Sequence, residues 1–319
     1  MNAANRKYYF MLFAVVIFWG LDPIATNFLY DYYSAAALAA FTTLVSALAF
    51  LILMRKDLKK LNFRFLRVAF PICLVNSAAC MFQRIGLQYT TPARYAFFEH
   101  LSCVAVPLIL FIFFRRRPST QQCFAAVLCL AGCLLLAGSD VVSGTFGIGD
   151  VLCMLAGIFL GIGIITTSEY TKDMDIRLFM VVHMCTYFIS SFLLMLAMNF
   201  ITVNGAPMEA IVFSLDPLHL LAAAAMGILI IGLCWLMRNE ATRHLSPNTI
   251  AVFAPIAAVI TAFTSILLGI ETAAPATLIA FVLILSAAIL AGLGEAKQET
   301  ELAQKMEEAE SPDSASVAK

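Results

Sequence analysis

The stretch SAAALAAFTTLVSALAFLILM, residues 34–54, runs directly into RKDLKK, residues 55–60. The first segment carries no charged side chain and has the length of ~20 apolar residues that an α-helix needs to cross a bilayer. The second segment adds four basic side chains, as the cytoplasmic flank of a spanning helix does. Together the two segments indicate a membrane span and the side of the membrane on which it ends.

The composition of the whole chain carries the same signal. Of its 319 residues, 62% are hydrophobic and 13% are charged, and the mean hydropathy is +0.91. Globular proteins average roughly 45–50% apolar and roughly 25% charged residues. A soluble enzyme, a nucleic-acid-binding protein and a secreted module are therefore poor fits. We expect the lipid bilayer as the surroundings and no nucleic acid as a partner.

Continuous apolar runs of about 20 residues predict ten transmembrane helices. Because the runs are continuous rather than alternating, helices are favoured over barrel strands. The predicted fold is an all-α integral membrane protein with spans at 8–29, 34–54, 68–88, 92–114, 119–139, 149–170, 178–202, 218–238, 247–268 and 273–294.

Lysine and arginine are distributed asymmetrically about these spans. With the N-terminus inside, the inner side receives eighteen of the 20 basic residues, and the outer connections 30–33, 140–148, 203–217 and 269–272 hold none. The positive-inside rule then predicts cytoplasmic termini for a multi-pass protein of the cell (inner or plasma) membrane. Residues 295–319 form an acidic cytoplasmic tail, expected to extend the last helix briefly and then to be disordered.

The chain divides after Val141 into halves of five spans each, and an odd number of spans inverts the second half relative to the first. QYTTPA at 88–93 corresponds in position to RHLSPN at 243–248, because each joins the third span of its half to the fourth. Each segment has proline after Thr or Ser, which is typical of a capped helix start. We therefore predict a first repeat at 1–141, an inverted repeat at 142–294 and a site where they meet near the bilayer midplane.

Five short motifs are spread over both halves: Phe18-Trp19-Gly20, Gly86-Leu87-Gln88-Tyr89-Thr90-Thr91-Pro92-Ala93, Gly149-Asp150, Arg243-His244-Leu245-Ser246-Pro247 and Leu267-Leu268-Gly269-Ile270-Glu271. In these motifs the chain resembles the drug/metabolite transporter superfamily, specifically its ten-helix EamA-like members, over about residues 8–294. The resemblance implies secondary transport of a small polar metabolite, often export of amino acids or related compounds. It also implies a cavity lined mainly by the third and fourth spans of each half and by the first span.

The chain departs from the pattern of this family in two places. The prolines usual in the middle of the fourth span of each half, where spacing points to Cys103 and Ala258, stand about one turn away at Pro107 and Pro255. The acidic residue usual after the 92–114 span is replaced by Arg116 or its neighbours. The kink positions and the cavity shape should differ accordingly, while the architecture should be kept.

Ionisable side chains at mid-span are costly, so they usually face a cavity and pair. At ~1.5 Å per residue, Glu99 lies roughly 12 Å and Arg84 roughly 9 Å below the same outer turn. We expect an Arg84–Glu99 pair that either lines a cavity or only clamps two spans together. His100 is either a packing residue or a proton carrier. Arg94 either snorkels to the outer interface or attracts substrate carboxylates.

Polar residues on three other spans complete the candidate site. Trp19 and Asp22 share a stripe on the first span, where Asp22, followed by Pro23, either contacts a cation or amine or caps a broken helix. Asn76 and Gln83 share one face of the third span. The candidate substrate-binding residues are Trp19, Asp22, Asn76, Gln83, Arg84, Arg94, Glu99, His100, Trp235, Arg238 and Asn239.

Trp235, Arg238 and Asn239 lie near the inner end of the 218–238 span. Arg238 either follows from positive-inside topology or mirrors Arg84 across the repeat. His183, on the 178–202 span, is interpreted as a packing residue.

The leading hypothesis is a secondary carrier that works by alternating access, as a monomer or homodimer, with proton coupling through Glu99 left open. Charges of both signs favour a zwitterionic small-molecule substrate. An integral-membrane enzyme acting on lipid or isoprenoid and a channel or receptor-like scaffold are the alternatives. We expect no enzymatic activity and no cofactor, because no span supplies a pair of carboxylates at helical spacing. We expect no metal, because the nine cysteines fall in apolar runs without a C-x-x-C pair, and primary pumping would need a partner subunit, because no G-x-x-x-x-G-K loop occurs.

Overall fold

A computed structural model of the chain describes residues 5–90, 97–137, 146–203, 206–269 and 274–310. Ten of its helices are long and apolar enough to cross a membrane, which confirms the predicted all-α fold class. The described helices of the first half are α1 (Arg6–Leu29), α2 (Ala35–Leu53), the 3-10 helix η1 (Leu58–Lys60), α3 (Phe63–Leu87), α5 (Ser102–Phe114) and α6 (Thr120–Ala137).

The second half repeats this succession of long helices. Its elements are α8 (Ile148–Tyr170), α9 (Ile176–Phe200), the two-residue strands β1 (Thr202–Val203) and β2 (Ala206–Pro207), α10 (Pro217–Met226), the π-helix η2 (Gly227–Leu233), α11 (Cys234–His244), α12 (Pro247–Phe253), α13 (Ile256–Leu267) and α14 (Pro275–Glu310). The two strands pair antiparallel between α9 and α10. α10, η2 and α11 form one continuous eighth span, Pro217–His244.

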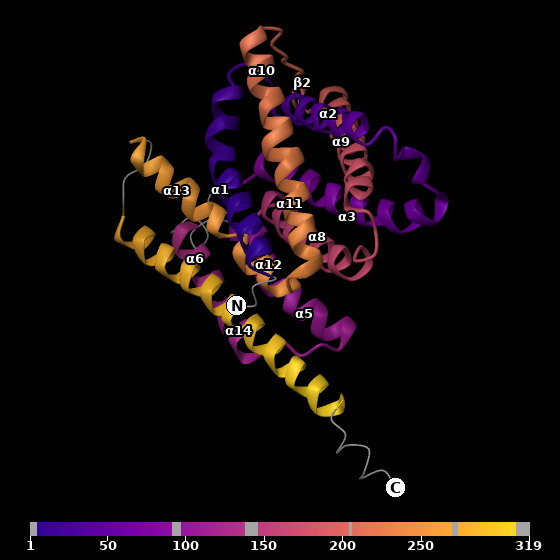
Figure 1. Cartoon of the computed structure of the whole chain (residues 1–319). Coiled ribbons are helices and arrows are strands. Elements are labelled where there is room, and N and C mark those ends of the chain that lie inside the picture. Colours follow the sequence, from indigo (N-terminus) through magenta and orange to yellow (C-terminus); the bar gives the residue numbers. More distant parts are fainter. Residues whose placement is uncertain (1–4, 91–96, 138–145, 204–205, 270–273, 311–319) are drawn as a thin grey trace.

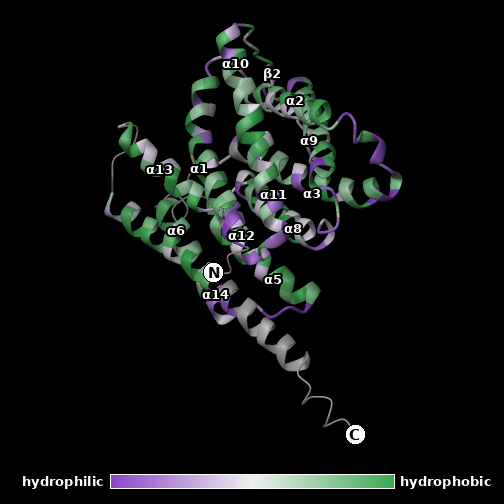
Figure 2. Cartoon of the chain, in the orientation of Figure 1, coloured by the Kyte–Doolittle hydropathy of each residue, from purple (hydrophilic) through white to green (hydrophobic). Residues whose placement is uncertain are grey.

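The helices pack in two groups on either side of α1 and the eighth span (Figure 1). One group contains α2, α3 and α9, and the other contains α6, α13 and α14. Figure 2 shows that the helices are apolar over most of their length, whereas hydrophilic residues gather at the connections. This distribution matches a bundle whose outer surface faces lipid.

Each main contact between helices has a counterpart when the two halves of the chain are interchanged. α1 packs on α13 and α8 packs on α5, while α2 pairs with α9 and α6 pairs with α14. α3 packs on α8 and α9, just as the eighth span packs on α1 and α2. A twofold relation between the halves would produce this pattern. The inverted repeat itself stays a prediction, and its boundary at Val141 lies outside the described residues.

The fourth span of each half is interrupted at a similar place. One interruption lies at His100–Leu101, before α5, and the other at Ala254–Pro255, between α12 and α13. At both places the backbone changes to bonds three residues apart, from Cys103 N–H to His100 O and from Ala257 N–H to Ala254 O. Pro255 sits at its break, whereas Pro107 lies inside the unbroken α5. The interruption before α5 thus falls where the polar candidate residues Glu99 and His100 lie.

Two predicted helix boundaries are wrong. The third span begins at Phe63 rather than 68, with the side chain of Asn62 accepting from Phe65 N–H at its N-cap. The eighth span ends at His244 rather than 238. Glu240 and Arg243 pair across one turn, so a polar segment stays helical after the apolar run has ended. Arg238 consequently lies inside the helix and not at its end.

Helix α1 runs without a break through Pro23, so the interpretation of Asp22 as the cap of a broken helix is wrong. Neighbouring side chains stabilise such a proline inside a spanning helix. At the other terminus, α14 continues to Glu310, so the last helix extends into the tail. The disorder predicted for the end of the tail concerns residues outside the described part of the chain.

Replacing Gly20 with alanine is expected to lower the melting temperature of the purified protein. A Cβ atom at Gly20 would come within 2.6 Å of Ile260 Cβ and 2.8 Å of Ala257 O, where α1 meets α13. Overpacking of this kind costs about 1–3 kcal/mol. Gly292→Ala is the control, since its nearest neighbours are atoms of Tyr9 at 3.8 Å. Equal melting temperatures for the two variants would contradict this close contact.

Candidate functional site

The guanidinium of Arg238 lies at the centre of a buried polar cluster. Arg238 on α11 is 2% exposed, and its Nη1 donates to Asn239 Oδ1 at 3.2 Å and to Asn76 Oδ1 on α3 at 3.5 Å. Asn239 Nδ2 also lies 3.3 Å from His183 Nδ1 on α9. The cluster therefore joins one helix of the first half to two helices of the second.

The two tryptophans of the chain meet beside this cluster. The rings of Trp19 on α1 and Trp235 on α11 are 5.7 Å apart in an edge-on arrangement, and Arg238 lies over the Trp235 ring at 4.9 Å. Trp19 Nε1 donates to Ile230 O at 3.4 Å, inside the π-helix η2. π-Helical segments are frequent at functional sites, because they offer backbone groups that an α-helix would use internally.

A small cavity opens between these groups. Trp19 and Arg238 line it together with apolar side chains from three spans: Leu12, Val15, Val16, Leu160, Ile164, Ile250 and Ala254. Arg238 is the only charged residue of this lining. One of the two interpretations of Arg238 from the sequence, that it follows from positive-inside topology, puts the residue at the membrane surface. The structure rejects that alternative, because the longer eighth span carries the guanidinium into the bundle.

A second polar group lies beside the first, toward the end of the bundle that the predicted topology places outside. Arg84 on α3 is half-buried, and its Nη1 donates to Ala35 O at the start of α2 at 3.5 Å. It interacts electrostatically with Asp22 on α1 and with Tyr187 on α9. Asp22 in turn accepts a hydrogen bond of 3.3 Å from Thr26. Three helices thus converge on Arg84.

Glu99 does not form the predicted ion pair with Arg84. Gln83 Nε2 donates to Glu99 Oε1 at 3.2 Å, and no ion pair within 4.0 Å joins Arg84 to Glu99 among the described residues. Successive residues of a helix point about 100° apart, so only one of Gln83 and Arg84 can face the fourth span. Gln83 takes that position, and Arg84 faces α1 and α2.

Of the two remaining candidates, His100 and Arg94, the structure describes only His100. Nδ1 of His100 is buried and has no hydrogen-bond partner at the interruption before α5. Arg94 lies outside the described residues. The predicted set thus forms two groups, an inner one around Arg238 and an outer one around Arg84 and Glu99.

Cys80 and Tyr187 connect these two groups, and neither was a candidate from the sequence. Cys80 on α3 lies in electrostatic range of Arg84, Glu99 and Arg238. Tyr187 on α9 packs edge-on against Trp235 with the ring centres 6.3 Å apart. His183, interpreted as a packing residue, is part of the polar cluster. The spacing of four between His183 and Tyr187 matches that of Asn76, Cys80 and Arg84, and this shared spacing was the overlooked signal.

The outer end of the bundle is tied across the two halves by the connection before α10. The carboxylate of Glu209 accepts from Ala35 N–H at 2.6 Å and Ala36 N–H at 3.1 Å, which caps α2. The hydroxyl of Tyr33 donates to Ser214 O at 3.1 Å. Burial, followed by the charge of Asp216, raises the pKa of Tyr33 above its ordinary value. We call this set the outer latch.

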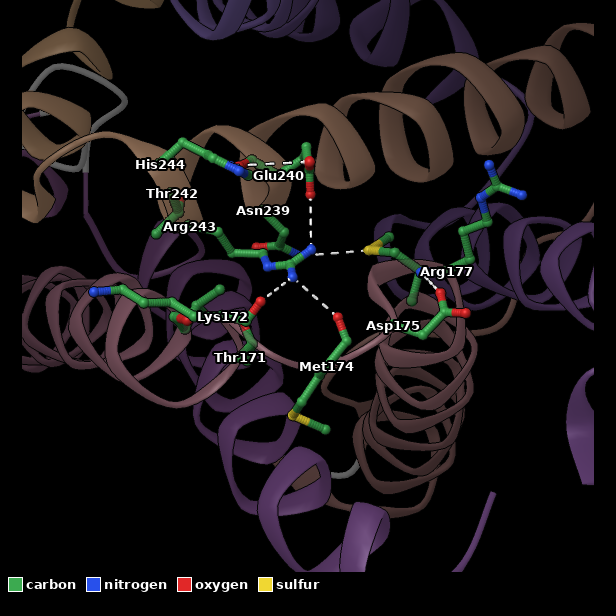
Figure 3. A network of polar contacts seen from close by, with 12 residues as sticks. Thr171, Lys172, Met174, Asp175, Arg177, Asn239, Glu240, Thr242, Arg243 and His244 are labelled. Atoms are coloured by element: carbon green, nitrogen blue, oxygen red, sulfur yellow. Dashed lines mark hydrogen bonds and ion pairs between the residues drawn. The ribbon is translucent and has the colours of Figure 1, made fainter. Parts of the chain in front are cut away.

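The inner end is tied across the halves as well. Arg116, after α5, forms two parallel bonds to the Glu169 carboxylate on α8, of 2.6 and 2.9 Å. Within the second half, Arg243 pairs with Glu240 at 2.9 Å and donates to the carbonyls of Lys172 and Met174 between α8 and α9, as Figure 3 shows. We call the Arg116–Glu169 pair the inner latch.

Comparison with known proteins finds a family match for the first half of the chain. Residues 6–138 match the EamA-like transporter family. An uncharacterized transporter of Archaeoglobus fulgidus is 28% identical over 103 residues, which are 32% of each chain, so the chain spans about a third of the relative in this match. A crystal structure of a protein with 16% identity, covering 92% of this chain and 99% of its own, superimposes with a TM-score of 0.71 and shares the fold.

The EamA-like match confirms the resemblance seen in the motifs of the first half. The structure shows what Arg116 contacts at the place where the chain departs from the family pattern. Arg116, one of the basic residues that stand where the resemblance implies an acidic one, is the partner of Glu169, so the charge at that end of the bundle is paired. The protein is a multi-pass membrane protein with an EamA-like segment.

Arg116→Glu is expected to destabilise the inner end, and Glu169→Arg added to it is expected to restore stability. The single change sets two carboxylates against each other, and the double change reverses the pair. Exposed pairs contribute ~0.2–1 kcal/mol, so we expect a shift of the melting temperature of a few degrees. Failure of the second substitution to restore the melting temperature would show that the pair does not stabilise this end.

Proposed function

We propose that the protein is a secondary transporter, not an enzyme, that moves a small polar metabolite by alternating access. The observation that carries the proposal is the two-part polar cluster, which draws charged and amide side chains from α1, α3, α9 and α11 into the interior of a membrane bundle. Groups of this kind are costly in a bilayer and usually mark a substrate pathway. The EamA-like match supports a carrier over a membrane enzyme or a channel.

The latches support alternating access. Each one ties the first half to the second, at opposite ends of the bundle, with the polar cluster between them. Opening one latch while the other stays closed would expose the cluster to one side at a time. In this proposal residues 1–141 and 142–294 are the two inverted repeats that move against each other.

The proposed substrate is an amino acid or a related compound, and the proposed direction is export. Arginines and carboxylates both occur in the cluster, so a zwitterion can be bound through charges of both signs. Glu99 is the candidate for proton coupling, because it is a half-buried carboxylate beside the helix interruption. The transporter would act as a monomer or homodimer in the cell membrane.

Comparison of metabolites inside and outside cells with and without the protein tests the substrate and the direction. Counterflow in proteoliposomes preloaded with the metabolite that changes most then tests transport itself. The proposal predicts faster exchange than in protein-free liposomes. Equal exchange for every metabolite selected in this way would contradict a carrier function.

Reporters fused to either terminus are expected to be active only in the cytoplasm. Basic residues concentrate on one side of the ten spans, and an even number of spans returns the chain to the side on which it began. A reporter placed after Lys297 checks the C-terminus, and one before Arg6 checks the N-terminus. Activity of the Lys297 fusion only outside the cell would contradict the even number of spans.

A further inference from the structure

Within the proposed transport function, we propose that Arg238 is the anchor for the carboxylate of the substrate, and that the group next to this carboxylate is apolar. The substrate class is thus a carboxylate with a hydrocarbon or aromatic body, such as a hydrophobic amino acid. This assignment moves the carboxylate site from Arg84, the outer arginine, to the inner one.

The hydrogen bonds of Arg238 leave most of its donors free. A guanidinium has five N–H donors, and both bonds of Arg238 come from Nη1, to amide oxygens at 3.2 and 3.5 Å. Nη2 and Nε donate to no described residue. The guanidinium therefore has an edge available to donate hydrogen bonds to the two oxygens of a carboxylate.

The positive charge of Arg238 is also unbalanced by its surroundings. No described carboxylate lies within 4.0 Å of the guanidinium, although the residue is only 2% exposed. Its neighbours Asn76, Asn239 and Trp235 are neutral. A buried charge without a counter-charge is costly, and an anionic ligand would remove that cost. Arg243, one turn further on, contrasts with it, because Glu240 and two carbonyls satisfy its terminal nitrogens.

The cavity beside Arg238 has a volume of about 20 Å³, room for one water, so a ligand enters only when the bundle opens there, and the lining indicates what that ligand would contact. Its lining is otherwise apolar or aromatic, including Trp19, Leu160, Ile164 and Ala254. A second polar group placed directly against these side chains would lose its hydration without gaining a partner. A hydrocarbon or ring next to the carboxylate would instead bury apolar surface against the indole and the aliphatic side chains.

Three leucine-related probes test this assignment on the purified full-length protein in lipid nanodiscs. L-Leucine has the carboxylate and the amine, 4-methylpentanoate lacks the amine, and L-leucinamide lacks the negative charge. Binding is followed by the fluorescence of the two tryptophans, Trp19 and Trp235, which both border the cluster. We expect L-leucine and 4-methylpentanoate to bind and L-leucinamide to bind at least tenfold more weakly.

Variants then locate the carboxylate. Arg238→Lys keeps the charge but loses the planar pair of donors, and it should weaken L-leucine binding at least tenfold. Arg177→Lys, an exposed arginine on α9, is the matched control and should leave binding unchanged. Ala254→Val occupies the small cavity while leaving the guanidinium, and it should also weaken binding. The comparison of L-leucine with L-leucinamide needs no variant, so it holds if Arg238→Lys fails to fold.

The proposal is overturned if L-leucinamide binds as well as L-leucine, if neither carboxylate probe binds, or if folded Arg238→Lys retains wild-type affinity. Counterflow separates this failure from that of the proposed function. A metabolite that the wild type and Arg238→Lys exchange equally fast would leave the transporter standing and remove Arg238 from substrate binding. A wild type that exchanges no metabolite would contradict the transport function itself.

Discussion

Arg84→Met is expected to abolish transport and to lower the amount of folded protein, and Asp22→Asn added to it is expected to restore the folded protein but not transport. Arg84 interacts electrostatically with Tyr187, with Tyr30 and with Asp22, the carboxylate among these three, so removal of either charge weakens the electrostatic stabilisation of the other. Coupling between interacting sites is ~0.5–3 kcal/mol. Quantitative membrane abundance and initial rates of counterflow measure the two effects separately.

A second cycle, Arg84→Met with Glu99→Gln, is the matched control for the first. Glu99 is bonded to Gln83 and not to Arg84, so the coupling free energy in this cycle should be smaller. Larger coupling to Glu99 than to Asp22 would restore the Arg84–Glu99 pair that the spacing suggests and contradict the geometry described above.

Glu99→Gln is expected to reduce transport strongly while leaving membrane abundance nearly unchanged. The amide oxygen of glutamine can still accept the hydrogen bond from Gln83, so this contact is kept while the charge is lost. Hydrogen bonds to charged groups contribute ~1.5–3 kcal/mol, and a loss of that size in the transport cycle corresponds to roughly tenfold to 100-fold slower exchange. Initial rates normalised to folded protein measure it.

Gln83→Met serves as the control for Glu99→Gln, since it removes the neutral partner and keeps the carboxylate. If Glu99 carries the coupling proton, an uncoupler will abolish concentrative transport by the wild type. Concentrative transport that persists under the uncoupler would remove the proton from the cycle. Equal losses of transport and abundance in Glu99→Gln would assign Glu99 a purely structural role.

The sequence predicted the ten spans because an apolar run long enough to cross a bilayer is a property of consecutive residues. It misplaced the end of the eighth span because hydropathy falls after Met237 while the helix continues to His244. Hydropathy marks the apolar segment, whereas the Glu240–Arg243 pair extends the helix beyond it. The error of six residues concealed the burial of Arg238.

The partners of the polar residues were harder to predict than their depth. Depth follows from counting residues, which placed Arg84 and Glu99 at similar levels. Pairing depends on the direction in which a side chain leaves its helix, and the sequence does not fix the rotation of α3 relative to the fourth span. Gln83 and Arg84 are adjacent, yet only Gln83 faces Glu99. Tyr187 was missed because an aromatic residue in an apolar helix is usually a packing residue.

The 19F NMR spectrum of protein labelled with 5-fluorotryptophan tests the central claim most directly, namely that the substrate binds where the two halves meet. The chain has two tryptophans, Trp19 from the first half and Trp235 from the second, with ring centres 5.7 Å apart. Addition of a substrate that shows counterflow should shift both resonances together, with the same concentration dependence. A transported substrate that leaves both resonances unchanged would show that the site lies elsewhere.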